Sequence, residues 1–172
     1  MNEQEKQLTE LYHRYGTELQ RLCYLYLKDY HLSEDAVSET FLRAWGKLPG
    51  FRGQAPMKTW LTRIAINVCR NRLRSPAYRE RSIEELTEAG NISEGLRSCR
   101  PEETEERLWV SGEIMALPVK YREVILLYYY QELTVKEIAR LLHVPASTVG
   151  GRLKRAKAML RSRLKEGYFD EA

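Results

Sequence analysis

The chain has 172 residues, of which 43% are hydrophobic and 30% are charged, and its net charge is +4. This composition excludes a disordered chain, and the length suggests one or two globular domains. The longest apolar run, residues 124–130, is far shorter than the roughly 20 residues that span a bilayer, and the N-terminus lacks the apolar core of a signal peptide. We therefore expect a cytoplasmic protein that does not insert into a membrane.

Helical periodicity dominates the first part of the chain. Apolar residues recur at intervals of three and four from Leu8 to Tyr26 and predict a long first helix. Ser33 is a suitable N-cap for a second helix, which ends before the sequence PGFRGQAP at residues 49–56. A third helix follows and ends at Ser75, because the residue before a proline is pushed out of the helical region.

The second predicted helix carries a surface of mixed chemistry. Its flank combines acidic, apolar and basic side chains, namely Asp35, Glu39, Leu42 and Arg43. A mixture of this kind favours docking to a protein over binding to DNA, whose surface is uniformly acidic.

Basic and aromatic residues gather on the third helix and the loop before it. Residues 52–79 carry seven basic and no acidic side chains, and Arg63, Asn67 and Arg70 lie on one helical face. Aromatic rings beside positive charge suit unstacked single-stranded bases, although core packing is an equally good interpretation of Trp60. The other residues of this candidate surface are Phe51, Arg52, Gln54 and Lys58. The alternative is a solvated arginine face.

The chain changes character after the third helix. Residues 76–106 have no sustained period, contain nine Glu from residue 80 onward, and predict a flexible acidic linker with a short helical stretch near residues 83–86. Helical periodicity then resumes and continues beyond Pro118, with a predicted core of Val124, Ile125, Leu127 and Tyr128. The predicted fold is all-α, with two small helical domains at residues 1–75 and 107–172 joined by the linker at 76–106.

A helix-turn-helix is the strongest signal in the second domain. Thr134 and Glu137 form a T-x-x-E capping box, and the short turn HVPA is followed by Ser147, a candidate cap for the next helix. Residues 147–165 carry seven basic and no acidic side chains. The apolar positions of this helix are Val149, Leu153, Ala156 and Leu160. A basic second helix of this kind enters the major groove of DNA, and a plain helical hairpin is the alternative.

Cysteine and histidine residues give no sign of a metal site or a catalytic centre. The three cysteines never form a C-x-x-C pair, and the three histidines are scattered without ligand spacing. No carboxylate cluster or histidine pair suggests an enzyme acting on nucleic acid. We therefore expect no metal, no cofactor and no catalytic residue.

The motifs and their order resemble the extracytoplasmic-function (ECF) group of bacterial RNA polymerase sigma factors. They are SEDAVSETFLRAW, FRGQAPMKTWLTRIAINVCRNRLR and LPVKYREVILLYYYQELTVKEIARLLHVPASTVGGRLKRAKAML, and they extend over nearly the whole chain. The resemblance implies a protein that binds core RNA polymerase and directs promoter-specific initiation in an envelope or other stress response. It also implies a membrane-linked anti-sigma factor as an inhibitory partner.

The resemblance assigns three sets of residues. Docking on core polymerase is implied for Asp35, Ser38, Glu39, Leu42 and Arg43. Recognition of the −10 promoter element is implied for Phe51, Arg52, Gln54, Lys58, Trp60, Arg63, Asn67 and Arg70. Recognition of the −35 element is implied for Ser147, Thr148, Gly150, Gly151, Arg152, Lys154 and Arg155. The acidic linker would thread toward the active-site and RNA-exit channel of the polymerase.

Two positions depart from the family pattern. Family members usually carry Gln where Ser38 stands, and a basic residue followed by Ser where Gly150 and Gly151 stand. The two glycines remove side-chain readout there, and we expect them to let backbone N–H groups approach a DNA phosphate closely.

Two other functions remain open on the residues alone. A stand-alone helix-turn-helix regulator explains the second half of the chain but leaves the basic, aromatic third helix unexplained. A small helical enzyme acting on nucleic acid would need a catalytic constellation that the sequence does not show.

Overall fold

The computed structural model describes residues 1–79, 89–99 and 101–164, and these residues contain helices and no strands. The chain divides into two compact units, Met1–Glu102 and Glu103–Ala172. The predicted all-α fold with two helical domains is thus confirmed. None of the helices in the described ranges is long and apolar enough to cross a membrane.

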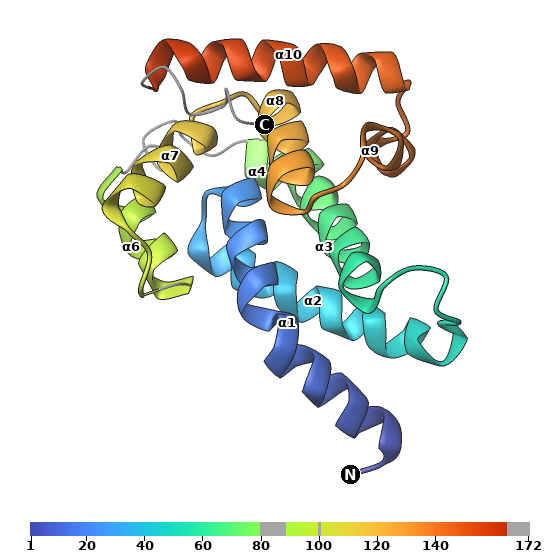
Figure 1. The fold of residues 1–172 in the computed structure, drawn as a ribbon. Helices are drawn as coiled ribbons and strands as arrows, with labels where there is room; N and C mark the ends of the chain where they lie inside the picture. The colour runs from blue at the N-terminus through green and yellow to red at the C-terminus, as the bar shows by residue number, and fades with distance from the viewer. Residues whose placement is uncertain (80–88, 100, 165–172) are drawn as a thin grey trace. The chain divides into compact units, whose positions relative to one another are not determined.

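Three long helices form the centre of the first unit (Figure 1). They are α1 (Glu3–Leu27), α2 (Tyr30–Lys47) and α3 (Met57–Arg74), and each packs against the other two. A short 3₁₀ turn, η1 (Leu48–Gly50), ends α2, and α4 (Pro76–Arg79) follows α3. The core side chains between the helices include Leu22, Cys23, Phe41, Ala44, Leu61, Ala65 and Val68.

The boundary between α1 and α2 differs from the prediction. Lys28 ends α1 in the left-handed conformation, with φ of 60°, and the side chain of Asp29 caps α2 by accepting from the Leu32 amide at 2.8 Å. Ser33 is not the N-cap: it is buried inside the helix, where its hydroxyl donates to the Tyr30 carbonyl at 2.6 Å. Both residues are good caps by type, so the sequence signal alone could not choose between them.

Part of the predicted linker is a helix of the first unit. Helix α6 (Ala89–Cys99) packs against α1, and Leu96 and Cys99 are buried there. The prediction of a flexible linker is therefore wrong for this stretch. The helix has only 11 residues and is rich in Gly, Asn and Ser, so its few apolar residues do not form a clear helical period in the sequence. The helical stretch predicted near residues 83–86 lies outside the described residues.

The second unit contains α7 (Glu105–Met115), α8 (Val119–Ile125), the π-helical turn η2 (Leu126–Tyr130), α9 (Val135–Leu142) and α10 (Ala146–Arg163). Helix α10 packs against α7, α8 and α9. The predicted core residues Val124, Ile125 and Leu127 are buried, but Tyr128 is 37% exposed. The π-helical turn shifts the helical register after Ile125, and this takes Tyr128 off the buried face.

A buried arginine fixes the turn between α7 and α8. Arg122 is 2% exposed, and its Nη1 donates to the Met115 and Leu117 carbonyls at 3.2 and 3.0 Å. These carbonyls lie at the C-terminal end of α7, where helical partners are missing and a cation is favoured. Arg122 thereby satisfies backbone groups that would otherwise be buried without partners.

The helix-turn-helix forms largely as predicted. Thr134 and Glu137 make the reciprocal capping box of α9, and His143 ends that helix with φ of 56°. The four predicted inward residues of α10 are buried, namely Val149, Leu153, Ala156 and Leu160. Ser147 does not cap α10: Pro145 is the residue before the helix, because its fixed φ lets the helix begin at Ala146.

Candidate functional surfaces

The outer face of α2 is solvent-exposed along three turns. Its inner face buries Ser33, Ala36, Val37, Thr40, Phe41 and Ala44 against the other helices. Opposite that face, Asp35, Ser38 and Leu42 are exposed, and Leu42 is 73% exposed. An apolar side chain this accessible, flanked by polar groups, is typical of the core of a protein-docking surface.

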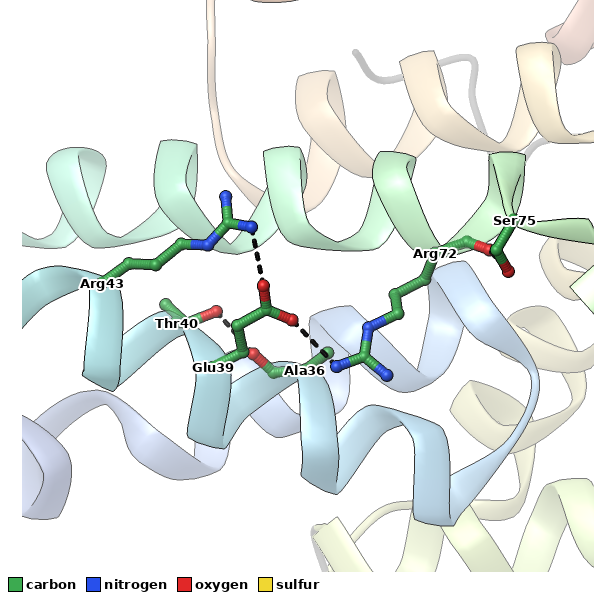
Figure 2. Close-up of polar contacts among 6 residues, drawn as sticks. All are labelled: Ala36, Glu39, Thr40, Arg43, Arg72 and Ser75. Carbon is green, nitrogen blue, oxygen red and sulfur yellow. Dashed lines mark hydrogen bonds and ion pairs between the residues drawn. The ribbon is translucent and has the colours of Figure 1, made fainter. Parts of the chain in front are cut away.

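Glu39 lies at the edge of that face and binds two arginines (Figure 2). Its Oε1 accepts from Arg43 Nη2 at 2.6 Å, and its Oε2 accepts from Arg72 Nη2 of α3 at 2.8 Å. The hydrogen bond from Arg72 is the main cause that holds the pKa of Glu39 below its ordinary value, with Arg43 adding to it. The three side chains are 31–41% exposed, so this is a surface cluster that joins α2 to α3.

The loop before α3 presents an aromatic pair. The rings of Phe51 and Trp60 lie 4.9 Å apart at an angle of 39°, and both residues are half-buried. Gly53 has a φ of 74°, a left-handed conformation that glycine adopts without strain. In the same loop, the Gln54 side-chain oxygen accepts a hydrogen bond from the Arg52 backbone amide at 3.1 Å. Trp60 therefore packs on the loop but keeps part of its ring accessible, which lies between full core packing and an open surface for base stacking.

The predicted polar face of α3 is only partly exposed to solvent. Arg63 and Asn67 are exposed, Arg70 is half-buried, and Arg52 and Gln54 are exposed on the loop. Lys58 forms an ion pair with Glu18 of α1, with 2.9 Å between Nζ and Oε2. This ion pair ties the start of α3 to α1.

The exposed side of α10 lacks side chains at two successive positions, Gly150 and Gly151. Ser147, Gly150, Gly151, Lys154 and Arg155 are exposed, and Thr148 and Arg152 are half-buried. A Cβ atom added at either glycine would meet no atom within 4 Å. The glycines are the fifth and sixth residues of the helix, beyond the four amides that lack helical partners. The glycines leave open space beside the first turn of α10, and the expectation that they let backbone N–H groups approach a DNA phosphate closely stays a prediction.

Sequence reasoning missed several residues of these surfaces. Arg72 belongs to the basic stretch at residues 52–79, but its pairing with Glu39 depends on the packing of α2 on α3, since the two residues are 33 positions apart in the sequence. Glu18, which holds Lys58, comes from α1 and carries no motif. Tyr121 of α8 was also missed: the hydrogen bond from Arg155 is the main cause that lowers the pKa of its phenol.

No metal site emerges from the described residues, since no group of three or more His, Cys, Asp or Glu side chains is placed to hold an ion. The three cysteines are buried thiols. Burial is the main cause that raises the pKa of the Cys99 thiol to about 11, so this thiol stays protonated near neutral pH.

A two-unit helical protein with a basic first-unit helix and a basic helix-turn-helix belongs to the class of DNA-binding transcription factors. Comparison with known families is more specific. Residues 11–80 match Sigma-70 region 2, and residues 107–160 match Sigma-70 region 4. The chain belongs to the ECF family of RNA polymerase sigma factors.

Curated relatives support the same assignment. The chain is 34% identical over 163 residues to the ECF RNA polymerase sigma factor SigW of Bacillus subtilis (strain 168), covering 88% of this chain and 86% of the relative. It is 31% identical over 139 residues to the ECF RNA polymerase sigma-E factor of Haemophilus influenzae, covering 76% and 73% of the two chains.

Solved structures share the fold. CnrH, solved in complex with the cytosolic domain of CnrY, has a TM-score of 0.61 and 26% identity, covering 92% of this chain and 88% of that chain. The sigma factor RpoE from Bartonella quintana, solved with the anti-sigma factor NepR, has a TM-score of 0.68 and 18% identity, covering 94% and 99%.

Family membership decides among the functions that the sequence left open. The protein is a sigma factor that directs transcription initiation, and it is not an enzyme. Sigma domains of this kind bind RNA polymerase and promoter DNA. A stand-alone regulator is excluded because the first unit, which such a regulator leaves unexplained, matches region 2.

Proposed function

We propose that the outer face of α2 docks on core RNA polymerase. The surface comprises Asp35, Ser38 and Leu42, with Glu39 and Arg43 at its edge. The observation that supports it best is the 73% exposure of Leu42 in the middle of a helix whose opposite side is fully buried. An apolar anchor surrounded by polar groups gains binding energy when a partner removes it from water.

The loop and outer face of α3 recognise the −10 element. The Phe51–Trp60 pair offers partly accessible rings on which a base separated from its duplex stacks, and stacking of this kind is sequence-tolerant. Arg52, Gln54, Lys58, Arg63, Asn67 and Arg70 supply charge and hydrogen bonds around the pair. The Lys58–Glu18 ion pair would open when a phosphate binds.

Helix α10 reads the −35 element in the major groove. Its exposed side carries Lys154 and Arg155, with Ser147, Thr148 and Arg152 beside the bare surface at Gly150 and Gly151. The basic side chains neutralise phosphates, and a bidentate arginine is the commonest reader of guanine edges.

A membrane-linked anti-sigma factor holds the protein inactive in the cytoplasm until a stress signal releases it. This proposal is supported by CnrH, which was solved with the cytosolic domain of another protein, CnrY. An inhibitor that covers the α2 and α10 surfaces together would use two modest contacts jointly, because the second contact becomes intramolecular after the first.

Run-off transcription with core polymerase tests the proposal directly. Adding the protein to core polymerase should yield transcripts from a subset of a broad promoter set, and a well-folded protein that yields none would contradict it. Changing Arg152 or Arg155 to Ala should weaken −35-dependent initiation and lower the salt dependence of DNA binding by about one phosphate contact each. Arg161→Ala, which removes the same charge two turns further along α10, is the matched control.

A further inference from the structure

Glu39 is poorly placed to contact a partner directly. Each of its carboxylate oxygens already accepts from a guanidinium, at 2.6 Å from Arg43 and 2.8 Å from Arg72 (Figure 2). A basic group of the polymerase that approached Glu39 would meet the positive charge of both arginines. The cluster of three side chains carries a net charge of +1, so it presents a cation to a partner, although its central residue is acidic.

Arg72 belongs to the inner side of α3. It follows Leu61, Ala65 and Val68 at intervals of four, three and four, and those three residues are buried in the core of the first unit. This position lies on a different side of the helix from the exposed residues Arg63 and Asn67. Arg72 therefore leaves α3 toward α2, where its guanidinium reaches the Glu39 carboxylate.

Arg43 is the most accessible member of the cluster, with a side chain that is 41% exposed. A guanidinium has five N–H donors. In the described residues, the hydrogen bond from Arg43 to Glu39 uses only Nη2 of the guanidinium. An unrestrained arginine loses much rotamer freedom when it binds, and a restraint present before binding reduces that loss. Glu39 supplies such a restraint, and Arg72 fixes Glu39 in turn.

We propose that Glu39 is a positioning residue for core polymerase binding: anchored by Arg72 of α3, it holds Arg43 at the edge of the α2 surface, where Arg43 donates to a carboxylate of the polymerase. This inference rests on the proposed docking of α2. It replaces a direct contact of Glu39 with an indirect one and adds Arg72 to the residues that matter for polymerase binding.

Epistasis separates a positioning role from a direct one. Core polymerase affinity is measured by anisotropy of the labelled full-length chain for Glu39→Gln, Arg72→Met and Arg43→Ala, alone and in pairs with Arg43→Ala. We expect each single change to weaken binding by about twofold to fivefold, as for a single surface ion pair. In the Arg43→Ala background, Glu39→Gln and Arg72→Met should have no further effect, because the residue that they position is absent.

Matched variants keep the result interpretable. Lys47→Met removes a positive charge from the exposed end of α2 and should leave affinity unchanged, and Arg72→Lys, which can still pair with Glu39, should retain most of the binding. A loss of fold would lower affinity in every background. A full effect of Glu39→Gln in the Arg43→Ala chain, or no effect in the parent chain, overturns the positioning role.

A third change distinguishes this inference from the docking proposal. Leu42→Ala removes the apolar anchor of the same surface without touching the cluster. If Leu42→Ala weakens binding and Arg43→Ala does not, docking stands and the positioning role is wrong. If neither change affects binding, the α2 surface itself is not the docking site, and the positioning role falls with it.

Discussion

Replacing Gly150 and Gly151 by alanine should make the protein more stable and a poorer reader of −35 DNA. Both glycines lie inside the 18-residue helix α10, and alanine is favoured over glycine there by about 1 kcal/mol per position. An added Cβ meets no atom within 4 Å at either position, so no clash offsets this gain. The double variant should therefore gain about 2 kcal/mol in the free energy of unfolding, which urea titration of the second-unit transition measures.

The effect on DNA binding has the opposite sign. If the bare surface allows the DNA backbone to approach the helix closely, two methyl groups hold the duplex away and weaken the contacts of the neighbouring basic residues. Affinity for a −35 duplex should fall severalfold, as measured by anisotropy at fixed salt concentration. Gly150→Lys combined with Gly151→Ser should change the preferred sequence in a randomised −35 library and leave core polymerase binding intact.

Gly112→Ala is the matched control for both measurements. Gly112 lies inside α7 of the same unit and also has open space around its added Cβ, so this change should stabilise the chain without affecting duplex affinity. If the variant at Gly150 and Gly151 is stabilised but binds the −35 duplex as tightly as the parent chain, the bare surface does not serve close approach of the DNA. An unstable double variant would instead refute the argument about open space.

Three further changes test the packing of the two units. Arg122→Met should lower the free energy of unfolding by about 2 kcal/mol or more in urea titrations, because two carbonyls at the end of α7 lose their buried donor, whereas the exposed Arg140→Met should have little effect. Gly95→Ala should release α6 and speed its amide hydrogen exchange, because an added Cβ would overlap the ring of Tyr24; Gly46→Ala, which has open space, should not. Burial is the main cause that raises the pKa of the Tyr24 phenol from 10.0 to about 12, and the nearby Cys99 thiol adds to it. The free energy of unfolding that depends on this phenol is therefore fully present below pH 10 and is lost as the pH rises through 12. Tyr24→Phe should reduce that alkaline loss when urea unfolding is compared at about pH 9 and about pH 11.

Much of the fold could be predicted because long helices repeat one signal many times. The capping box at Thr134 and the four buried residues of α10 follow from local spacing, and the structure places them as expected. Caps are harder, because Asp29 and Ser33 are equally good by type and only packing decides which one is buried.

Contacts between distant residues could not be predicted from spacing. Arg122 has the sequence appearance of a surface residue, yet the turn that it closes requires a buried donor. The pairing of Glu39 with Arg72 depends on how α2 crosses α3, and no local pattern encodes a crossing. Motifs in the sequence indicate the exposed residues of α2, α3 and α10, and the roles of these residues in binding stay predictions that the variants above test.

Helix α6 shortens the free chain between the two units, because it takes residues 89–99 out of the predicted linker. A free segment over residues 76–106 would reach about 105 Å when fully extended, whereas the chain from 100 to 104, between α6 and α7, reaches at most about 18 Å. With α6 docked on α1, most of the reach of the predicted linker is lost. Undocking α6 from α1 would return its 11 residues to the free chain between the two units.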